Sequence, residues 1–175
     1  MKKDICLLMT LLVVNSCSFH SIQYDYIKGL ISQEEQDLQP QKNWTAIWMN
    51  QYIDLYAINV KDQVIFVDEE INIFFKEDQI YKITGLLPNN EILEIEPTKT
   101  SLKYKLNGVQ ISLDSCKEKK VLGQKNESII YSRVCYQERV ENSYKNEVII
   151  NSDNLITGLK FKVHPNYPLL ELSKK

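Results

Sequence analysis

The sequence predicts an all-β fold, either an antiparallel β-sandwich or a strongly curved meander sheet, with one short helix near the N-terminus. Three observations support this prediction. Between residues 44 and 175, apolar and polar side chains alternate with a period of two in several short runs. Breaks rich in Asp, Asn, Glu and Pro separate the runs at about the 8–12-residue spacing of antiparallel strands. No long helical period interrupts them, which argues against a parallel sheet.

The clearest element is a β-hairpin. In residues 102–106 apolar side chains alternate with lysines, and in residues 109–114 they alternate with polar side chains. Asn107-Gly108 joins the two runs, and this dipeptide favours a two-residue turn because both positions accept a positive φ. Residues 159–163 alternate in the same way. We expect the apolar face of these strands to be buried and the polar face to be solvated.

Further strands are predicted from shorter β-rich runs that are bounded by turn residues. These runs are 51–60, 63–67, 71–76, 79–84, 91–96, 128–140, 147–151 and 169–172. Residues 117–128 are charged and contain one glycine, which is typical of an exposed loop.

The segment before the strands has a different character. Residues 18–43 are polar and rich in Gln, and apolar side chains between 22 and 31 recur at helical spacing. We expect one short amphipathic helix there, followed by a linker over residues 34–42.

The N-terminus is predicted to be a targeting segment. Lys2-Lys3 precedes an apolar run over residues 5–14, which at about 1.5 Å per residue is too short to cross a membrane. The sequence from Val14 to Cys17, with Ser16 before the cysteine, resembles the lipobox of bacterial lipoproteins.

The lipobox resemblance implies that residues 1–16 are a signal peptide and that Cys17 carries palmitate or similar acyl chains. Ser18 resembles the residue that directs such proteins to the outer membrane. The expected organisation is therefore a signal peptide, then Cys17 with the helix and linker over 17–43, and a single β domain over 44–175. The lipid would hold the domain on the outer membrane, facing the periplasm or the cell surface.

The predicted location also suggests a role for each of the four cysteines. Cys6 would leave with the signal peptide and Cys17 would carry lipid, so Cys116 and Cys135 remain in an oxidising compartment. Their spacing does not fit a zinc site. We predict a disulfide between them.

Composition and motifs give little support for catalysis. A net charge of −2 shows no basic footprint for nucleic acid. Serine-hydrolase, zinc-protease and phosphate-loop motifs are absent from the sequence. The acidic clusters at 68–70 and 77–78 fall in predicted turns, and His164 precedes a proline at a strand end, where a surface or turn position is expected. We predict no enzyme activity, no metal and no cofactor; an enzyme would require a catalytic constellation around His164.

The aromatic residues Trp44, Trp48 and Tyr52 are spaced four apart. On one face of a strand or helix they could stack on sugar rings. The alternative is that they pack in the core of the sheet, as aromatic side chains commonly do.

Two segments carry a resemblance to a known family. Residues 71–95 contain a strand, a turn, a strand ending at Gly85-Leu86 and an Asn-rich step, and residues 133–172 contain the pattern Cys-x-x-Glu-x-Val starting at Cys135. In this order they resemble the outer-membrane lipoproteins of group 4 capsule and exopolysaccharide operons (YjbF/GfcB-like). The resemblance implies a non-enzymatic accessory role in polysaccharide secretion or assembly, alongside other envelope proteins of the export system.

A different envelope role remains open from the residues themselves. The chain would then be a binding or assembly module unrelated to polysaccharide, such as a subunit of an outer-membrane machine or an inhibitor of a host factor.

Overall fold

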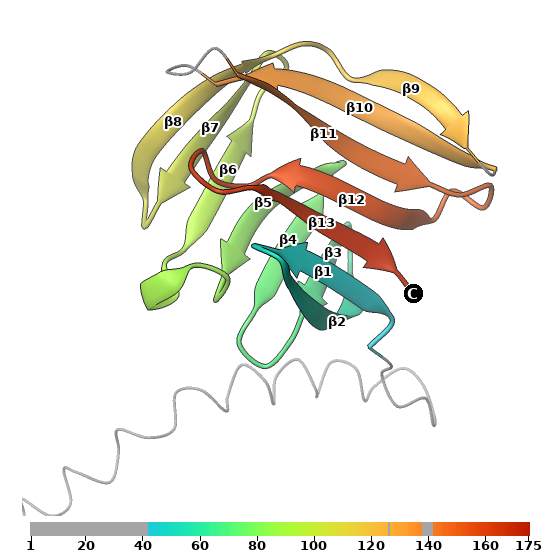
Figure 1. The fold of residues 1–175 in the computed structure, drawn as a ribbon, viewed down its shortest axis with the longest axis horizontal. Helices are drawn as coiled ribbons and strands as arrows, with labels where there is room; N and C mark the ends of the chain where they lie inside the picture. Colours follow the sequence, from blue (N-terminus) through green and yellow to red (C-terminus); the bar gives the residue numbers. More distant parts are fainter. Residues whose placement is uncertain (1–41, 126, 138–141) are drawn as a thin grey trace, which may run out of the picture. The chain divides into compact units, whose positions relative to one another are not determined.

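Antiparallel strands make up most of the described part of the chain in a computed structural model, which describes residues 42–125, 127–137 and 142–175 (Figure 1). The strands are β1 (Trp44–Trp48), β2 (Gln51–Val60), β3 (Gln63–Val67), β4 (Asn72–Lys76), β5 (Gln79–Thr84), β6 (Leu93–Pro97), β7 (Ser101–Leu106), β8 (Val109–Cys116), β9 (Lys120–Lys125), β10 (Ser128–Tyr136), β11 (Ser143–Ile150), β12 (Ile156–Lys162) and β13 (Leu169–Lys174). A 3₁₀ turn, η1 (Pro88–Asn90), lies between β5 and β6.

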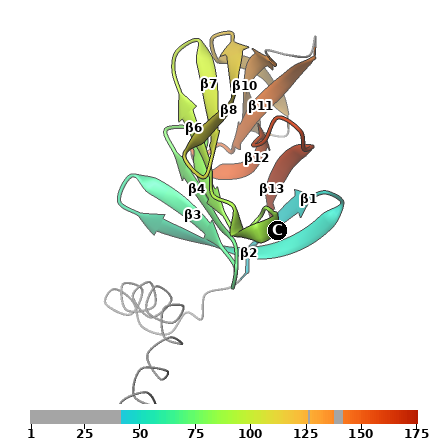
Figure 2. The ribbon, with the colours of Figure 1, turned by 90° about the vertical axis from the view of Figure 1, so that its left-hand side faces the viewer.

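The sheet closes on itself. Each strand from β1 to β7 pairs with the next one along the chain, and so does each strand from β10 to β12. β13 in turn pairs with β1 (Figure 2). The ring is completed by β10, which pairs with β11 along its length and with β8 at Cys116 and Ser115. Twelve strands therefore form a closed antiparallel barrel. β9 pairs with the same edge of β10 as β8 does.

The prediction of an all-β antiparallel sheet is confirmed, but the sandwich and the curved open sheet are wrong. Alternation of apolar and polar side chains is the same in an open sheet and in a closed one, so it does not report closure. Closure depends on the pairing of β8 with β10, which lie on either side of β9 in the sequence.

The predicted N-terminal helix over residues 22–31 lies outside the described residues. Within residues 42–125, 127–137 and 142–175, no helix is long and apolar enough to cross a membrane.

Most predicted strands are present, with β2, β3 and β5 at the predicted bounds. The exposed loop predicted for residues 117–128 is wrong in part, because β9 occupies 120–125. This strand forms by pairing with β10 and not by burial, since Val121 and Leu122 are exposed. A strand without a buried face gives no alternating signal in the sequence.

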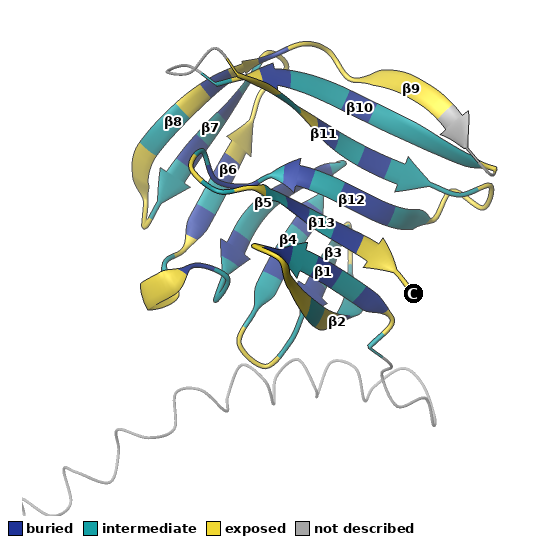
Figure 3. Ribbon diagram, viewed as in Figure 1, coloured by how far each residue is buried: buried dark blue, intermediate teal, exposed yellow. Residues whose placement is uncertain are grey.

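The inward side chains fill the barrel with an apolar core. Figure 3 colours the buried residues of each strand dark blue. Side chains from opposite walls meet inside. Phe75 on β4 lies edge-on to Phe161 on β12, with 6.3 Å between ring centroids. The core is therefore formed by side chains of the barrel itself, as in other small barrels.

The face that β8 buries is the opposite of the predicted one. Val109 is 67% exposed, whereas Asp114 is fully buried. Cys116, Asp114 and Ser112 share a face because strand residues alternate. The disulfide holds Cys116 in the interior, so its polar neighbours also point inward.

Candidate functional site

The predicted aromatic face does not come together. Trp44 and Trp48 are only 5% and 4% exposed, whereas Tyr52 is 77% exposed. The turn at Met49 and Asn50, both with positive φ, ends β1, and Tyr52 on β2 pairs with Ile47. Spacing of four residues places side chains on one face only within a continuous strand. The two tryptophans pack in the core, as the alternative interpretation proposed, and do not present a sugar-stacking surface with Tyr52.

The predicted disulfide is confirmed. Cys116 and Cys135 are bonded and lie directly opposite each other on β8 and β10. This pair is one of the two residue pairs through which β8 meets β10, and the Lys117 amide adds a hydrogen bond to the Val134 carbonyl at 2.9 Å. The bridge therefore fastens the seam that closes the barrel. Cys17, the predicted lipid site, lies outside the described residues.

The acidic clusters lie in turns, one between β3 and β4 and the other between β4 and β5. Asp68 pairs with Lys42 at 2.8 Å, and Asp78 pairs with Lys119. Nowhere in the described part of the chain do three or more His, Cys, Asp or Glu side chains come together as a metal site.

The structure instead shows a cavity of about 650 Å³ that the sequence did not predict. Its walls come from the β4–β5 turn, the β6–β7 turn, the link before β9, and the inner face of β10 to β12. The Lys119–Asp78 ion pair connects two of these segments, and the Lys119 ammonium lies 4.9 Å from the centre of the Tyr131 ring. A volume of this size accommodates a small-molecule ligand, for which pockets of roughly 300–1,000 Å³ are usual.

Arg133 projects from β10 into the wall of this cavity. Its Nη2 donates to the carbonyls of Thr98 and Lys99 at 2.6 and 2.8 Å, and its Nε donates to the Lys117 carbonyl at 3.3 Å. No described carboxylate forms an ion pair with it. Partial burial lowers the pKa of the guanidinium, yet arginine stays protonated in proteins. A positive charge that has no counter-ion among the described residues therefore lines the cavity.

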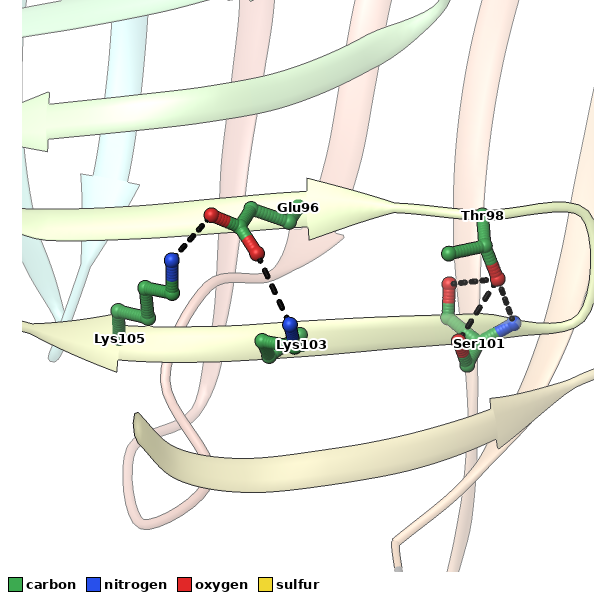
Figure 4. Close-up of polar contacts among 5 residues, drawn as sticks. All are labelled: Glu96, Thr98, Ser101, Lys103 and Lys105. Carbon is green, nitrogen blue, oxygen red and sulfur yellow. Dashed lines mark hydrogen bonds and ion pairs between the residues drawn. The ribbon is translucent and has the colours of Figure 1, made fainter. Parts of the chain in front are cut away.

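The β6–β7 turn that contacts Arg133 is held rigidly by its own side chains (Figure 4). Thr98 Oγ1 accepts from the Ser101 amide at 2.9 Å and contacts the Ser101 hydroxyl at 2.7 Å. Beyond the turn, Glu96 pairs with both Lys103 and Lys105, whose hydrogen bonds lower the pKa of its carboxyl group. The turn therefore holds the carbonyls of Thr98 and Lys99 in place for Arg133.

Asn146 lies opposite Arg133 on the neighbouring strand β11 and also lines the cavity. Its Oδ1 accepts from the Lys162 amide at 2.8 Å. Its Nδ2 has no hydrogen-bond acceptor among the described residues, although the residue is only 3% exposed. A buried donor without an acceptor costs about 1–3 kcal/mol. A purely structural role for Asn146 therefore does not account for its buried Nδ2.

A polar network lies on the same inner walls. Tyr144 donates a hydrogen bond to the buried Asp114 carboxylate at 2.7 Å, and Ser112 donates another at 2.6 Å. The Tyr104 hydroxyl lies 2.8 Å from that of Tyr144 and donates to the Lys162 carbonyl at 2.9 Å. Burial raises the pKa of both tyrosines, so both hydroxyls stay protonated. The network links β7, β8, β11 and β12 across the interior.

The disulfide supplies the signal by which these residues could have been found. Cys135 faces inward, so Arg133 and Tyr131, two and four positions before it, share that face. A charged side chain two positions from a buried cystine therefore indicates a polar interior.

His164 lies in the bend after β12, as predicted, but it is buried and not on the surface, with 8% exposure. Its Nδ1 accepts a hydrogen bond from the Asn166 amide at 3.1 Å, and its ring lies 4.6 Å from that of Tyr167. Burial lowers the pKa of the imidazole below 6.5. The lowered pKa favours the neutral ring, in which Nδ1 can accept this hydrogen bond.

This environment predicts a pH dependence of stability. Below about pH 6.5 the unfolded chain binds a proton at His164 before the folded chain does, so the free energy of unfolding falls as the pH drops. The loss is at most about 1.4 kcal/mol per pH unit for one proton, and it ends below the pKa of the folded state. Urea unfolding between about pH 7.5 and about pH 5.5 measures it, in a range where most carboxyl groups stay ionised.

The matched variant is His164→Asn, whose side-chain oxygen replaces Nδ1 as the acceptor without titrating. We expect the variant to lose less stability between the two pH values than the wild type does. An equal loss in both proteins would contradict the assignment to His164.

Comparison with known proteins gives a fold relationship. No protein-family model and no curated protein matches the chain. The chain is similar to the crystal structure of the hypothetical lipoprotein YmcC from Escherichia coli K12, with a TM-score of 0.52 and 10% identity over 83% of this chain and 93% of that one. YmcC is of the group 4 capsule lipoprotein YjbF family. At this identity the two proteins share a fold, and this chain therefore has the fold of a hypothetical lipoprotein.

Proposed function

We propose that the chain is a non-enzymatic lipoprotein of the bacterial outer membrane and an accessory factor in the secretion or assembly of capsule or exopolysaccharide. The observation that carries the proposal is the fold shared with YmcC over 83% of this chain. YmcC is a hypothetical lipoprotein of a capsule lipoprotein family, and the lipobox-like sequence before Cys17 supports the same kind of anchor here.

In this proposal each part of the chain has a physical role. Acyl chains on Cys17 anchor the protein in the membrane, since each buried methylene contributes about 0.8 kcal/mol. The barrel is a compact body closed by a covalent bridge, which suits an oxidising compartment. Its partners would be other envelope proteins of the same export system.

Deletion of the gene in the producing bacterium tests the function. Surface polysaccharide should fall, and the wild-type chain should restore it. Cys17→Ser should yield a protein that takes up no labelled palmitate, leaves the outer-membrane fraction and restores little polysaccharide. The matched control is Cys6→Ser, which removes a cysteine from the signal peptide and should behave as wild type.

Unchanged surface polysaccharide after deletion would overturn the proposal. Purification through a C-terminal tag gives an independent result, because recovery of an envelope assembly unrelated to polysaccharide would favour the alternative module. Labelling of the Cys17→Ser protein with palmitate would contradict the lipid site.

A further inference from the structure

The cavity described above has one wall that offers only hydrogen-bond donors. Arg133 and Asn146 are direct cross-strand partners, so their side chains leave the sheet on the same face at about 5 Å from each other. The Nε and Nη2 atoms of Arg133 donate hydrogen bonds to backbone carbonyls, and no described residue accepts one from its Nη1. The Asn146 amide has a buried Nδ2 to which no described residue offers an acceptor. An occupant of the cavity could therefore supply the acceptor for the donors on this wall.

The remaining surface of the cavity is suited to a ring. Tyr131 lies two residues before Arg133 on β10, and Phe161 and Val148 form a buried apolar floor on β12 and β11. Aromatic and aliphatic walls with a few fixed polar groups are typical of small-molecule sites. The occupant should therefore combine an anionic acceptor with a compact ring.

The charges around the cavity favour an anion beside Arg133 and Asn146, but not beside the turns that carry the acidic side chains. Lys119 is neutralised by Asp78, and Lys76 by Asp62. The other charged lining residues besides Arg133 are Lys99, Glu77 and Glu118, and their formal charges sum to −1. The acids belong to the turns, whereas Arg133 lies on the sheet wall, so an occupant with one carboxylate and several hydroxyls would match both regions.

We propose that this cavity binds a sugar residue bearing a carboxylate, which accepts hydrogen bonds from Arg133 and Asn146 while its ring lies against Tyr131. The choice of a saccharide rests on the proposed function. A charge-assisted pair of donors is among the stronger ways in which proteins recognise a carboxylate. In this proposal the ligand of the protein belongs to the class of acidic polysaccharides.

The test uses the full lipidated chain, purified in detergent and titrated by calorimetry with trigalacturonate. Its fully methyl-esterified form is the neutral control, and glutarate tests the carboxylate without a ring. We expect one trigalacturonate per chain. Binding to the ester should be weaker by at least about tenfold, the effect of losing one charge-assisted hydrogen bond. Binding to glutarate should be weaker by at least about tenfold as well, because glutarate has no ring to lie against Tyr131.

Two variants locate the site. Asn146→Asp keeps the acceptor for the Lys162 amide but places an internal carboxylate opposite Arg133, and Arg133→Gln removes the charge. Each should weaken trigalacturonate binding by at least about tenfold. The matched control is Lys175→Gln, which removes the same charge from an exposed position that does not line the cavity, and it should bind as wild type does. Thermal unfolding of each variant verifies that it is folded.

Several results would overturn the inference. They are the absence of trigalacturonate binding to the wild type, equal affinity for the ester or for glutarate, and unchanged affinity in whichever of the two cavity variants folds. The outcome is separable from that of the proposed function. Binding at the cavity with unchanged surface polysaccharide after deletion would remove the proposed function and leave the site, whereas the reverse would remove only the site.

Discussion

Reduction of the Cys116–Cys135 disulfide is expected to lower the free energy of unfolding by about 3 kcal/mol. The two cysteines are 19 positions apart, and closing a loop of this size restricts the unfolded chain by about that amount in the chain-entropy model. The effect has a local part as well. β8 and β10 meet at two residue pairs, one of which is the cystine itself. Without the bond, the barrel is closed at this seam by very few backbone contacts.

Urea unfolding of the oxidised and the reduced wild-type chain measures the loss with no change in sequence. Hydrogen exchange then locates it. The amides of Cys116 and Lys117 donate to the carbonyls of Thr100 and Val134, and they should exchange faster after reduction. Amides in the β2–β3 hairpin should change less. A reduced protein with the same stability and the same protection at the seam would show that the bond does not hold the barrel closed.

Local features of the chain explain why many strands could be predicted. Asn107-Gly108 favours a hairpin turn regardless of its surroundings, and β7 and β8 do flank it. The disulfide could be predicted because two cysteines remained for one oxidising compartment. Such inferences need only neighbouring residues or a residue count.

Features that depend on distant pairing could not be predicted in this way. Alternation in β8 indicated that Leu113 faces the core and Asp114 the solvent, but the fully buried Asp114 accepts hydrogen bonds from Ser112 and Tyr144 on the inside. The inward face is determined by the bond from Cys116 to another strand. Barrel closure and the cavity beside Arg133 arise from the same long-range pairing, and they became visible only with the structure.

Replacement of Gly85 by alanine is expected to cost about 2–5 kcal/mol of stability. Gly85 follows β5 with φ of +76°, and a Cβ built there would lie 1.9 Å from the Glu70 carbonyl oxygen. The left-handed backbone costs an alanine about 1–2 kcal/mol, and forcing extra volume into a packed site costs about 1–3 kcal/mol more. The obstacle is backbone, so no side-chain rotation relieves it. The connection before β4 would have to move away from β5.

Gly108→Ala is the matched control, because it separates the two contributions. Gly108 also has a positive φ, +80°, but nothing lies within 4 Å of a Cβ built there. It should lose about 1–2 kcal/mol, from backbone strain alone. Urea unfolding of both variants gives the difference, which measures how tightly the β3–β4 connection packs on the end of β5. Equal losses at the two positions would mean that this close approach is absent, since the strain term is common to both.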